Sequence, residues 1–334
     1  AVAAVPLISS WLGQSFYLSF ATRIVIFAIG ATGLNLVLGY GGLVSMGHSL
    51  YVGIGAYAVG IASAHGLDNG WAQLAIALGL TVVVSLACGL LSLRTRGIGF
   101  IMITLAFGQM FYFLAVGLKQ YGGDDGLSLN QRSIFSPLPA LDGKVALYYI
   151  ALAVLFAALY AVRRVVNSRF GYVLRGFQSN ERRMLAAGYP RLRYQLPAFA
   201  ASACLCAMAG VLLTNLTGFT SPSYLSWQAS GDLLLIVVLG GMGTVMGPVV
   251  GAVVLLALEE TLSGMTSHWM IVLGPVILGV ALLSRQGLWG VVMQWRCGEA
   301  APAPAGVSEE RLEGVPAGAG ISGTLGALQK PEAV

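Results

Sequence analysis

The sequence predicts an all-α, polytopic bundle of transmembrane helices, and three observations lead to this fold class. Charged residues make up 9% of the 334 residues, against roughly a quarter in an ordinary soluble domain. Hydrophobic residues make up 57%, and the mean hydropathy is +0.81. Apolar runs of about 20 residues recur, which is the length that crosses a bilayer as a helix. Because a helix satisfies its own backbone hydrogen bonds in lipid, these runs predict about eight to nine spans.

The spans can be placed in order from the apolar runs. Five runs are continuous, at residues 18–39, 71–93, 98–118, 145–162 and 196–216. Another run follows a glycine-rich segment and ends near His65, and a further one starts at Leu233, is interrupted by glycines and resumes over 249–262. We expect a last span over 268–283. We also expect a helix before residue 1, because the apolar opening AVAAVPLIS is too short to span.

The basic residues predict which side of the membrane each loop faces. Residues 163–193 hold eight of the eighteen Lys and Arg residues and a single acid, Glu181. Short loops rich in Lys and Arg stay in the cytoplasm, so this loop, Arg94 and Arg96 are predicted to be inside, and Asp124 outside. The net charge of +5 falls on the cytoplasmic loops and therefore does not indicate binding to nucleic acid.

The composition divides the chain into two parts. We predict a transmembrane domain over 1–296, with 163–193 as a cytoplasmic coupling loop. Residues 297–334 are rich in Ala, Gly, Pro and Glu and lack periodicity, so they are predicted to be a disordered or peripheral tail. The four cysteines lack metal-ligand spacing and are interpreted as packing residues, and no metal site is predicted.

Two glycine-rich segments resemble each other, LGYGGLVSMGHSLYVG at 38–53 and LGGMGTVMGPVVG at 239–251. Breaks at corresponding positions of two halves predict an internal repeat and a substrate path lined by broken helices. Close helix packing through glycine is the alternative. The predicted path residues are Asn35, Gly41, Gly42, Ser45, Gly47 and His48 in the first segment, and Gly240, Gly241, Gly243 and Gly247 in the second.

Other polar residues within the spans have more than one interpretation. His48 either caps a helix start or lines the path, since an intramembrane polar group is a candidate for either role. Thr104 and Gln109 are five residues apart and are predicted to form separate helix–helix hydrogen bonds. Glu259 and Glu260 are predicted to lie at the outer interface, at the end of their run.

Within the basic loop, SNERRMLAAG predicts a short helix. Ser179 or Asn180 can cap its start, Glu181 suits its positive end, and Gly188 ends it before Pro190. Lying between two spans, this helix is predicted to transmit motion from a soluble partner. The alternative is a surface helix that touches anionic headgroups.

Four segments resemble the membrane-spanning subunits of LIV-type ABC importers, the branched-chain amino acid permeases. They are GLNLVLGYGGLVSMGHSLYVGIGAYA, GGDDGL, FGYVLRGFQSNERRMLAAGYPRLRYQLPAFAASA and LLLIVVLGGMGTVMGPVVGAVVL. The third is the most specific, because it resembles the cytoplasmic coupling-helix region by which ABC permeases contact their ATPase. The resemblance implies an ATPase contact that comprises Glu181, Arg182, Arg183, Ala186, Ala187 and Gly188. At Arg182 and Arg183 the family more often carries acidic and alanine residues.

The resemblance implies a permease subunit in the bacterial cytoplasmic (inner) membrane. It implies two ABC ATPase subunits that use ATP and Mg, a second homologous permease subunit, or a second copy, and a periplasmic substrate-binding protein. The chain itself has no GxxxxGK[ST] phosphate loop and is predicted to bind no cofactor. The implied substrate is a branched-chain or other hydrophobic amino acid, although related permeases move urea, short amides or aromatic acids.

Two functions from other classes remain as alternatives. An ion-coupled secondary transporter would need carboxylates within the membrane, whereas Asp232, Glu259 and Glu260 are predicted at segment ends. A membrane enzyme would need a nucleophile and a base close together. The three histidines, His48, His65 and His268, do not cluster in the sequence, so no catalytic residue is predicted.

Overall fold

The computed structural model describes residues 15–129, 133, 144–265, 271–275, 277, 279 and 287–290. Residues 1–293 form one compact unit, and 294–334 a second. The predicted tail at 297–334 lies outside the described residues, and so does most of the expected span 268–283. The division at residue 296 therefore stays a prediction.

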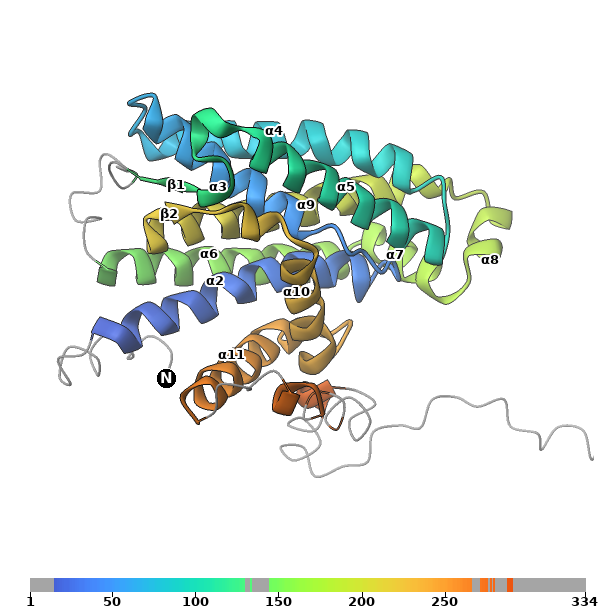
Figure 1. The fold of residues 1–334 in the computed structure, drawn as a ribbon. Coiled ribbons are helices and arrows are strands. Elements are labelled where there is room, and N and C mark those ends of the chain that lie inside the picture. Colours follow the sequence, from blue (N-terminus) through green and yellow to red (C-terminus); the bar gives the residue numbers. More distant parts are fainter. Residues whose placement is uncertain are drawn as a thin grey trace, which may run out of the picture. The chain divides into compact units, whose positions relative to one another are not determined.

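The described residues form a bundle of helices (Figure 1). The helices are α2 (Ser15–Leu38), α3 (Ser49–Ala64), α4 (Gly70–Ser92), α5 (Ile98–Gly117), α6 (Lys144–Val166), α7 (Arg169–Ser179), α8 (Glu181–Ala186), α9 (Arg191–Thr217), α10 (Trp227–Gly240) and α11 (Gly247–Met265). Three short 3-10 helices are η2 (Lys119–Tyr121), η3 (Gly123–Asp125) and η4 (Pro222–Leu225). The predicted all-α class is confirmed.

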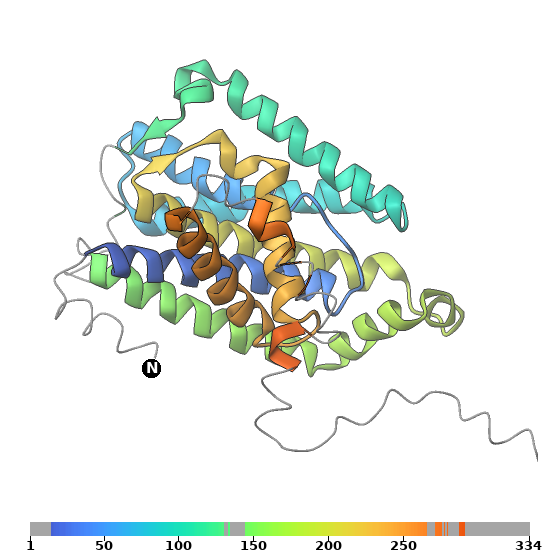
Figure 2. The same ribbon diagram turned by 60° about the horizontal axis from the view of Figure 1, so that its bottom comes forward.

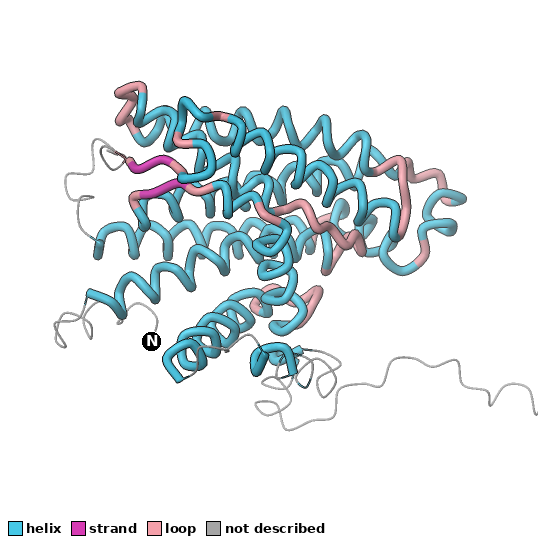
Figure 3. Tube along the Cα trace, in the orientation of Figure 1, coloured by secondary structure: helices cyan, strands magenta, loops and turns pink. Residues whose placement is uncertain are grey.

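A small antiparallel sheet joins two connecting loops at one end of the bundle (Figure 3). Strand β1 (Leu127–Ser128) pairs with β2 (Phe219–Thr220), with Leu127 opposite Thr220. By the predicted topology both loops are on the outer side. The sheet therefore ties the loop after α5 to the loop after α9.

Six of the described helices, α2, α4, α5, α6, α9 and α11, are long and apolar enough to cross a membrane. They coincide with the six runs predicted to span at these places. Helices α3 and α10 are apolar but have only 16 and 14 residues, about 24 and 21 Å at 1.5 Å per residue. Because the hydrocarbon core is about 30 Å thick, these two helices are too short to cross it unaided. In Figures 1 and 2, α10 runs across the direction of α2 and α6.

Helix α9 is the centre of the bundle and packs against α2, α3 and α4. One hydrophobic cluster joins α2, α6, α9, α10 and α11, and includes Ile29, Tyr148 and Ile236. A second joins α3, α4, α5 and α9, and includes Tyr51 and Phe199. Small residues permit the close approach, because a Cβ on Gly33 of α2 would lie 2.8 Å from the carbonyl oxygen of Ser202 on α9.

Candidate translocation path and coupling element

The two glycine-rich segments form helix breaks that lie side by side. The first break, residues 39–48, joins α2 to α3, and the second break, residues 241–246, joins α10 to α11. The buried side chain of Asn35 connects them: its Nδ2 donates to the carbonyl oxygen of Thr244 at 2.8 Å, and its Oδ1 accepts from the N–H of Gly243 at 3.0 Å. Asn35 therefore satisfies backbone groups that the second break leaves unpaired.

Several glycines at the breaks are required by close packing. A Cβ on Gly39 would collide with the backbone nitrogen of Gly243, and one on Gly240 would collide with the carbonyl of Gly247. Gly243 also has a φ of +75°, which side chains other than glycine rarely adopt. For Gly240 and Gly247 the structure supports the close-packing alternative. A role of these glycines in lining a path stays a prediction.

His48 is fully buried and lies at the end of the first break. Its Nδ1 is 2.8 Å from Oγ of Ser45, and its Nε2 is 2.9 Å from Oγ of Ser202. Ser202 donates its only hydroxyl proton to the carbonyl of Gly33 at 2.6 Å. Nε2 must therefore carry the imidazole proton and donate it, while Nδ1 accepts from Ser45, which leaves the ring neutral.

This geometry decides part of the open question about His48. His48 occupies the N-cap position of α3, as one alternative predicted, but its ring makes no capping hydrogen bond to the helix backbone; a role in lining the path stays a prediction. The ring instead packs edge-on against Tyr51 and Phe199, with centroids 5.7 and 5.4 Å away. His48 thus fastens the first break to α9 and, through Ser202, to α2.

Thr104 of α5 holds the middle of the first break. Its hydroxyl accepts from the N–H of Met46 at 3.2 Å and donates to the carbonyl of Ile101 at 3.0 Å. Gly47 lies so close that a Cβ there would collide with the carbonyl of Thr104. The sequence predicted that Thr104 would form a hydrogen bond with another helix. This prediction is wrong, because Thr104 instead bonds the backbone of the first break.

The predicted coupling helix is present as α8, and Asn180 rather than Ser179 caps it. Oδ1 of Asn180 accepts from the N–H of Arg183 at 3.0 Å. Gly188 has a φ of +85° and ends the turn, as predicted. The side chain of Met184 points toward α7. Its sulfur lies 2.6 Å from the position that a Cβ on Gly176 would occupy.

The carboxylate of Glu181 anchors α8 to the bundle. Its Oε1 lies 3.2 Å from Nε of Arg96 and 3.4 Å from Nη1 of Arg191. Arg191 also donates from Nη2 to the carbonyl of Thr95 at 3.2 Å. Glu181 thus holds the turn between α4 and α5 and the start of α9, two partners that the sequence did not predict. In the sequence, these ion pairs were indicated only by opposite charges at positions far apart.

The opposite side of α8 is open in this chain. Arg182, Arg183, Ala186, Ala187 and Gly188 are exposed. Beside them Leu185, Tyr189 and Leu192 expose 39%, 38% and 41% of their surfaces. The exposed face therefore mixes cationic and apolar side chains, a composition found at protein interfaces. Contact of these residues with an ATPase stays a prediction.

Helix α7 connects α8 to the first break. Gly42 has a φ of +67°, and a Cβ on it would lie 3.0 Å from Cγ of Gln178. A Cβ on Gly41 would lie 3.6 Å from Cδ1 of Leu174, another α7 residue. Contacts therefore run from α8 through α7 to the first break, and through Asn35 to the second break.

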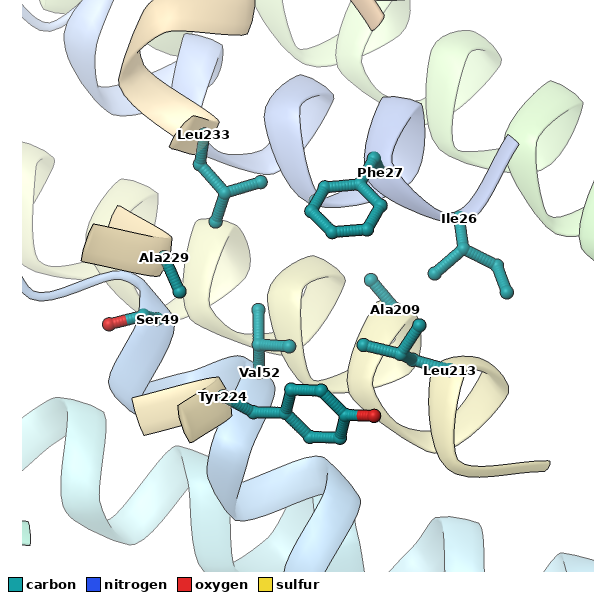
Figure 4. Close-up of a pocket in the computed structure, with 10 residues that line it drawn as sticks. Ile26, Phe27, Ser49, Val52, Ala209, Leu213, Tyr224, Ala229 and Leu233 are labelled. Atoms are coloured by element: carbon teal, nitrogen blue, oxygen red, sulfur yellow. The ribbon is translucent and has the colours of Figure 1, made fainter. Parts of the chain in front are cut away.

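A cavity of about 40 Å³ lies beside the starts of α3 and α10 (Figure 4). Its lining is almost wholly apolar and comprises Ile26, Phe27, Gly30, Ser49, Val52, Ala209, Leu213, Tyr224, Ala229 and Leu233. Ser49 donates to the carbonyl of Ser226 at 2.9 Å and accepts from the hydroxyl of Ser230 at 2.6 Å. These bonds tie the two short helices together where both begin.

Asp232 and Glu259 are not at the ends of their helices, which corrects the sequence-based expectation. Asp232 is the sixth residue of α10, and Glu259 and Glu260 lie more than one turn before the end of α11 at Met265. Asp232 lies on α10, which packs against α2, the helix of Arg23, and against α11, the helix of Glu259. The sequence missed the depth of these charges because helix boundaries, rather than apolar runs, set it.

Comparison with known proteins identifies a family of membrane permeases. Residues 16–281 match the model of a family described as branched-chain amino acid transport system / permease component. The chain is 27% identical over 291 residues to the high-affinity branched-chain amino acid transport system permease protein LivM of Escherichia coli (strain K12), covering 80% of this chain and 68% of that protein.

A second relative is named for a different substrate. The autoinducer 2 import system permease protein LsrC of Enterobacter sp. (strain 638) is 29% identical over 294 residues, which cover 81% of this chain and 82% of that protein. No solved structure matches. Because the family model spans most of the chain, including both breaks and α8, this protein belongs to the branched-chain amino acid transport system permease family.

Proposed function

We propose that this chain is the membrane-spanning subunit of an ATP-driven importer for branched-chain or other hydrophobic amino acids in the bacterial cytoplasmic membrane. The observation that carries the proposal is the coupling element. A capped helix with an exposed cationic and apolar face is fastened to the bundle by Glu181 and is linked to both helix breaks. Such a helix can receive motion from a soluble partner.

The contacts suggest how that motion reaches the spans. Two partner ATPases bind ATP and Mg and close beneath the bundle, and they displace α8. Met184 packs on Gly176, so α7 moves with α8, and Gln178 of α7 meets Gly42 in the first break. Asn35 then carries the displacement to the second break. Every step after the displacement of α8 uses a contact between described residues of this chain.

The outer face is where a periplasmic binding protein would deliver substrate. The loops proposed to receive it, 119–144 and 217–232, are joined by the β1–β2 pair. Trp227, the first residue of α10, is 54% exposed, and exposed aromatic residues are common at protein interfaces. A second homologous permease subunit, or a second copy of this chain, completes the translocation path.

The apolar cavity favours a substrate with an aliphatic side chain. Its wall includes Ile26, Val52 and Leu233. LivM of E. coli is named for branched-chain amino acids and LsrC for autoinducer 2, so family membership alone does not select the substrate. Urea, short amides and aromatic acids are the alternatives within the same family.

One observation favours a rival function. Asp232 lies inside α10 rather than at its end, and an intramembrane carboxylate is typical of ion-coupled transporters. The two mechanisms differ in their source of energy. An ion-coupled carrier needs a proton or sodium gradient, whereas the proposed importer needs ATP on the cytoplasmic side.

The test is reconstitution of the affinity-purified complex in proteoliposomes, with its binding protein and radiolabelled leucine. We expect ATPase subunits to co-purify, and uptake to require ATP and to survive a protonophore. Leu185→Glu on α8 should abolish uptake, while Leu67→Glu, at an exposed position in the α3–α4 loop on the other side, should not. Uptake that ignores ATP but collapses with the gradient would establish the rival.

A further inference from the structure

Three charged residues lie within α2, α10 and α11, three helices that pack against one another, and lipid would not solvate their charges. Arg23 is eight residues, about 12 Å, from the start of α2, and Glu259 is six residues, about 9 Å, from the end of α11. Asp232 adjoins Leu233, whose Cδ2 lies 3.3 Å from a Cβ built on Gly30, deep within α2. Arg23 and Asp232 are exposed in this chain, and Glu259 is half-buried.

Exposed charges at this depth require water or a polar partner. A charged side chain facing hydrocarbon costs about 2.5–3.5 kcal/mol even on the most permissive scale. Residues of this kind in membrane proteins face a water-filled path or another subunit. We therefore expect the side chains of Arg23, Asp232 and Glu259 to meet water or a polar partner rather than lipid.

Two of the charged residues, Arg23 and Asp232, lie next to residues that line the apolar cavity. Phe27 lines the cavity (Figure 4), and the guanidinium of Arg23, one turn earlier on the same face, lies 5.7 Å from its ring centre. Asp232 stands between cavity residues Ala229 and Leu233 in the sequence and lies one turn from Ala229. A small molecule at the cavity mouth would thus meet both signs of charge.

We propose that Arg23, Asp232 and Glu259 together with the cavity form a binding site for an aliphatic amino acid zwitterion along the translocation path. The proposal deepens the proposed function and rests on it. A guanidinium binds a carboxylate through paired hydrogen bonds, and the two carboxylates suit an ammonium group. The aliphatic side chain enters the cavity between Ile26, Val52 and Leu233.

The cavity volume agrees with a ligand whose aliphatic side chain lies inside the cavity and whose charged groups lie outside it. A water-sized group needs roughly 10–15 Å³ of such space, so a cavity of about 40 Å³ has room for about three of them. That is the size of an isopropyl or isobutyl end, not of a whole amino acid. The charged groups of the ligand would stay outside, among Arg23, Asp232 and Glu259.

Cysteine accessibility in the assembled complex tests the site. In a background in which the four native cysteines are replaced by alanine, Asp232→Cys should react with a charged, membrane-impermeant thiosulfonate reagent, and leucine should slow the reaction at least fivefold. Val83→Cys, which is 66% exposed on α4, is the control for a lipid-facing position and should not react.

The outcomes separate the possibilities. Labelling of Asp232→Cys only after the complex is dissociated would mean that a second permease subunit covers this position, and would overturn the proposal. Labelling that leucine does not slow would also overturn it.

Measurement of leucine uptake is a second test of the site, and it does not require the cysteine-free background. Asp232→Asn should lower leucine uptake at least tenfold without loss of assembly, and Asp232→Glu should restore part of it. Unchanged uptake by Asp232→Asn in a complex whose wild type shows ATP-dependent uptake would refute the site and leave the proposed function intact. Absence of uptake by the wild type would instead refute the proposed function.

Discussion

The first and second breaks share a glycine pattern and touch each other, yet the protein holds them in different ways. The first break is mostly buried and is fixed by Thr104 of α5, by Ser202 of α9 through His48, and by Gln178 of α7. The second break is more open, with Met242 and Met246 55% and 41% exposed. Asn35 of α2 makes two hydrogen bonds to the backbone of this break, and Val245 packs against the hydrophobic core.

This difference indicates unequal roles for the two breaks. The first break is held by several helices, because its Met46 and His48 hydrogen-bond to the buried side chains of Thr104 and Ser202. The second break forms hydrogen bonds with one amide, that of Asn35, and packs through Val245 and against Gly39. A displacement of the first break would therefore move the second, while the second has freedom to change without disturbing the core.

The largest effect on this comparison should come from His48→Ala. The substitution removes two buried hydrogen bonds and an aromatic ring packed on Tyr51 and Phe199, so we expect a loss of about 3–5 kcal/mol. Thermal unfolding of the purified complex in detergent measures it. His65→Ala, which removes a single exposed hydrogen bond to Tyr121, should cost less than about 1 kcal/mol. Equal losses would show that the first break is not rigidly held.

Asn35→Ala should cost about 2–4 kcal/mol, because it leaves the N–H of Gly243 and the carbonyl of Thr244 without their partner. Hydrogen exchange should then quicken at residues 241–246 and stay slow at 39–48. Asn69→Ala removes an exposed cap on α4 and serves as the control for a lost asparagine. Faster exchange in both breaks would contradict the dependence of the second break on the first.

Gly42→Ala separates backbone strain from contact with α7. The φ of +67° makes alanine unfavourable by about 1–2 kcal/mol, and the new methyl group presses on Gln178. Gly66→Ala carries the same strain, since its φ is +74°, but faces open space. We expect similar losses of stability, with ATP-dependent uptake reduced at least fivefold in Gly42→Ala alone. Equal uptake in the two variants would argue against transmission through this contact.

Thr104→Val should have the smallest effect, about 0.5–1.5 kcal/mol from the lost bond to Met46. Thr81→Val is its matched control, because the buried Thr81 hydroxyl finds no hydrogen-bond partner among the described residues. Removing that hydroxyl should leave the unfolding temperature unchanged or raise it. A lower unfolding temperature for Thr81→Val than for Thr104→Val would reverse the expected order.

Much of the architecture follows from local sequence signals. Six long spans fall where the apolar runs predict them, because a helix in lipid is specified by its own length and hydropathy. The coupling helix was predictable for the same reason, since Asn180 as cap and Gly188 as terminator act within a few residues of the helix. The glycine patterns likewise marked both breaks correctly.

The sequence could not reveal contacts between distant residues. Asn35 meets Gly243 across 208 positions, and nothing in either segment specifies that pairing. The role of His48 depended on Ser202 of α9, whose bond to Gly33 decides which ring nitrogen donates. The partners of Glu181 were hidden for the same reason.

The sequence by itself determined that this chain is a helical membrane protein with two glycine breaks and a short helix in a basic loop, because hydropathy, capping and glycine act locally. The tertiary structure alone decided that the breaks meet, that α3 and α10 are short, and that Asp232 lies within a helix. Those features depend on which helix faces approach each other. Such choices are set by packing across the whole bundle rather than by any single segment.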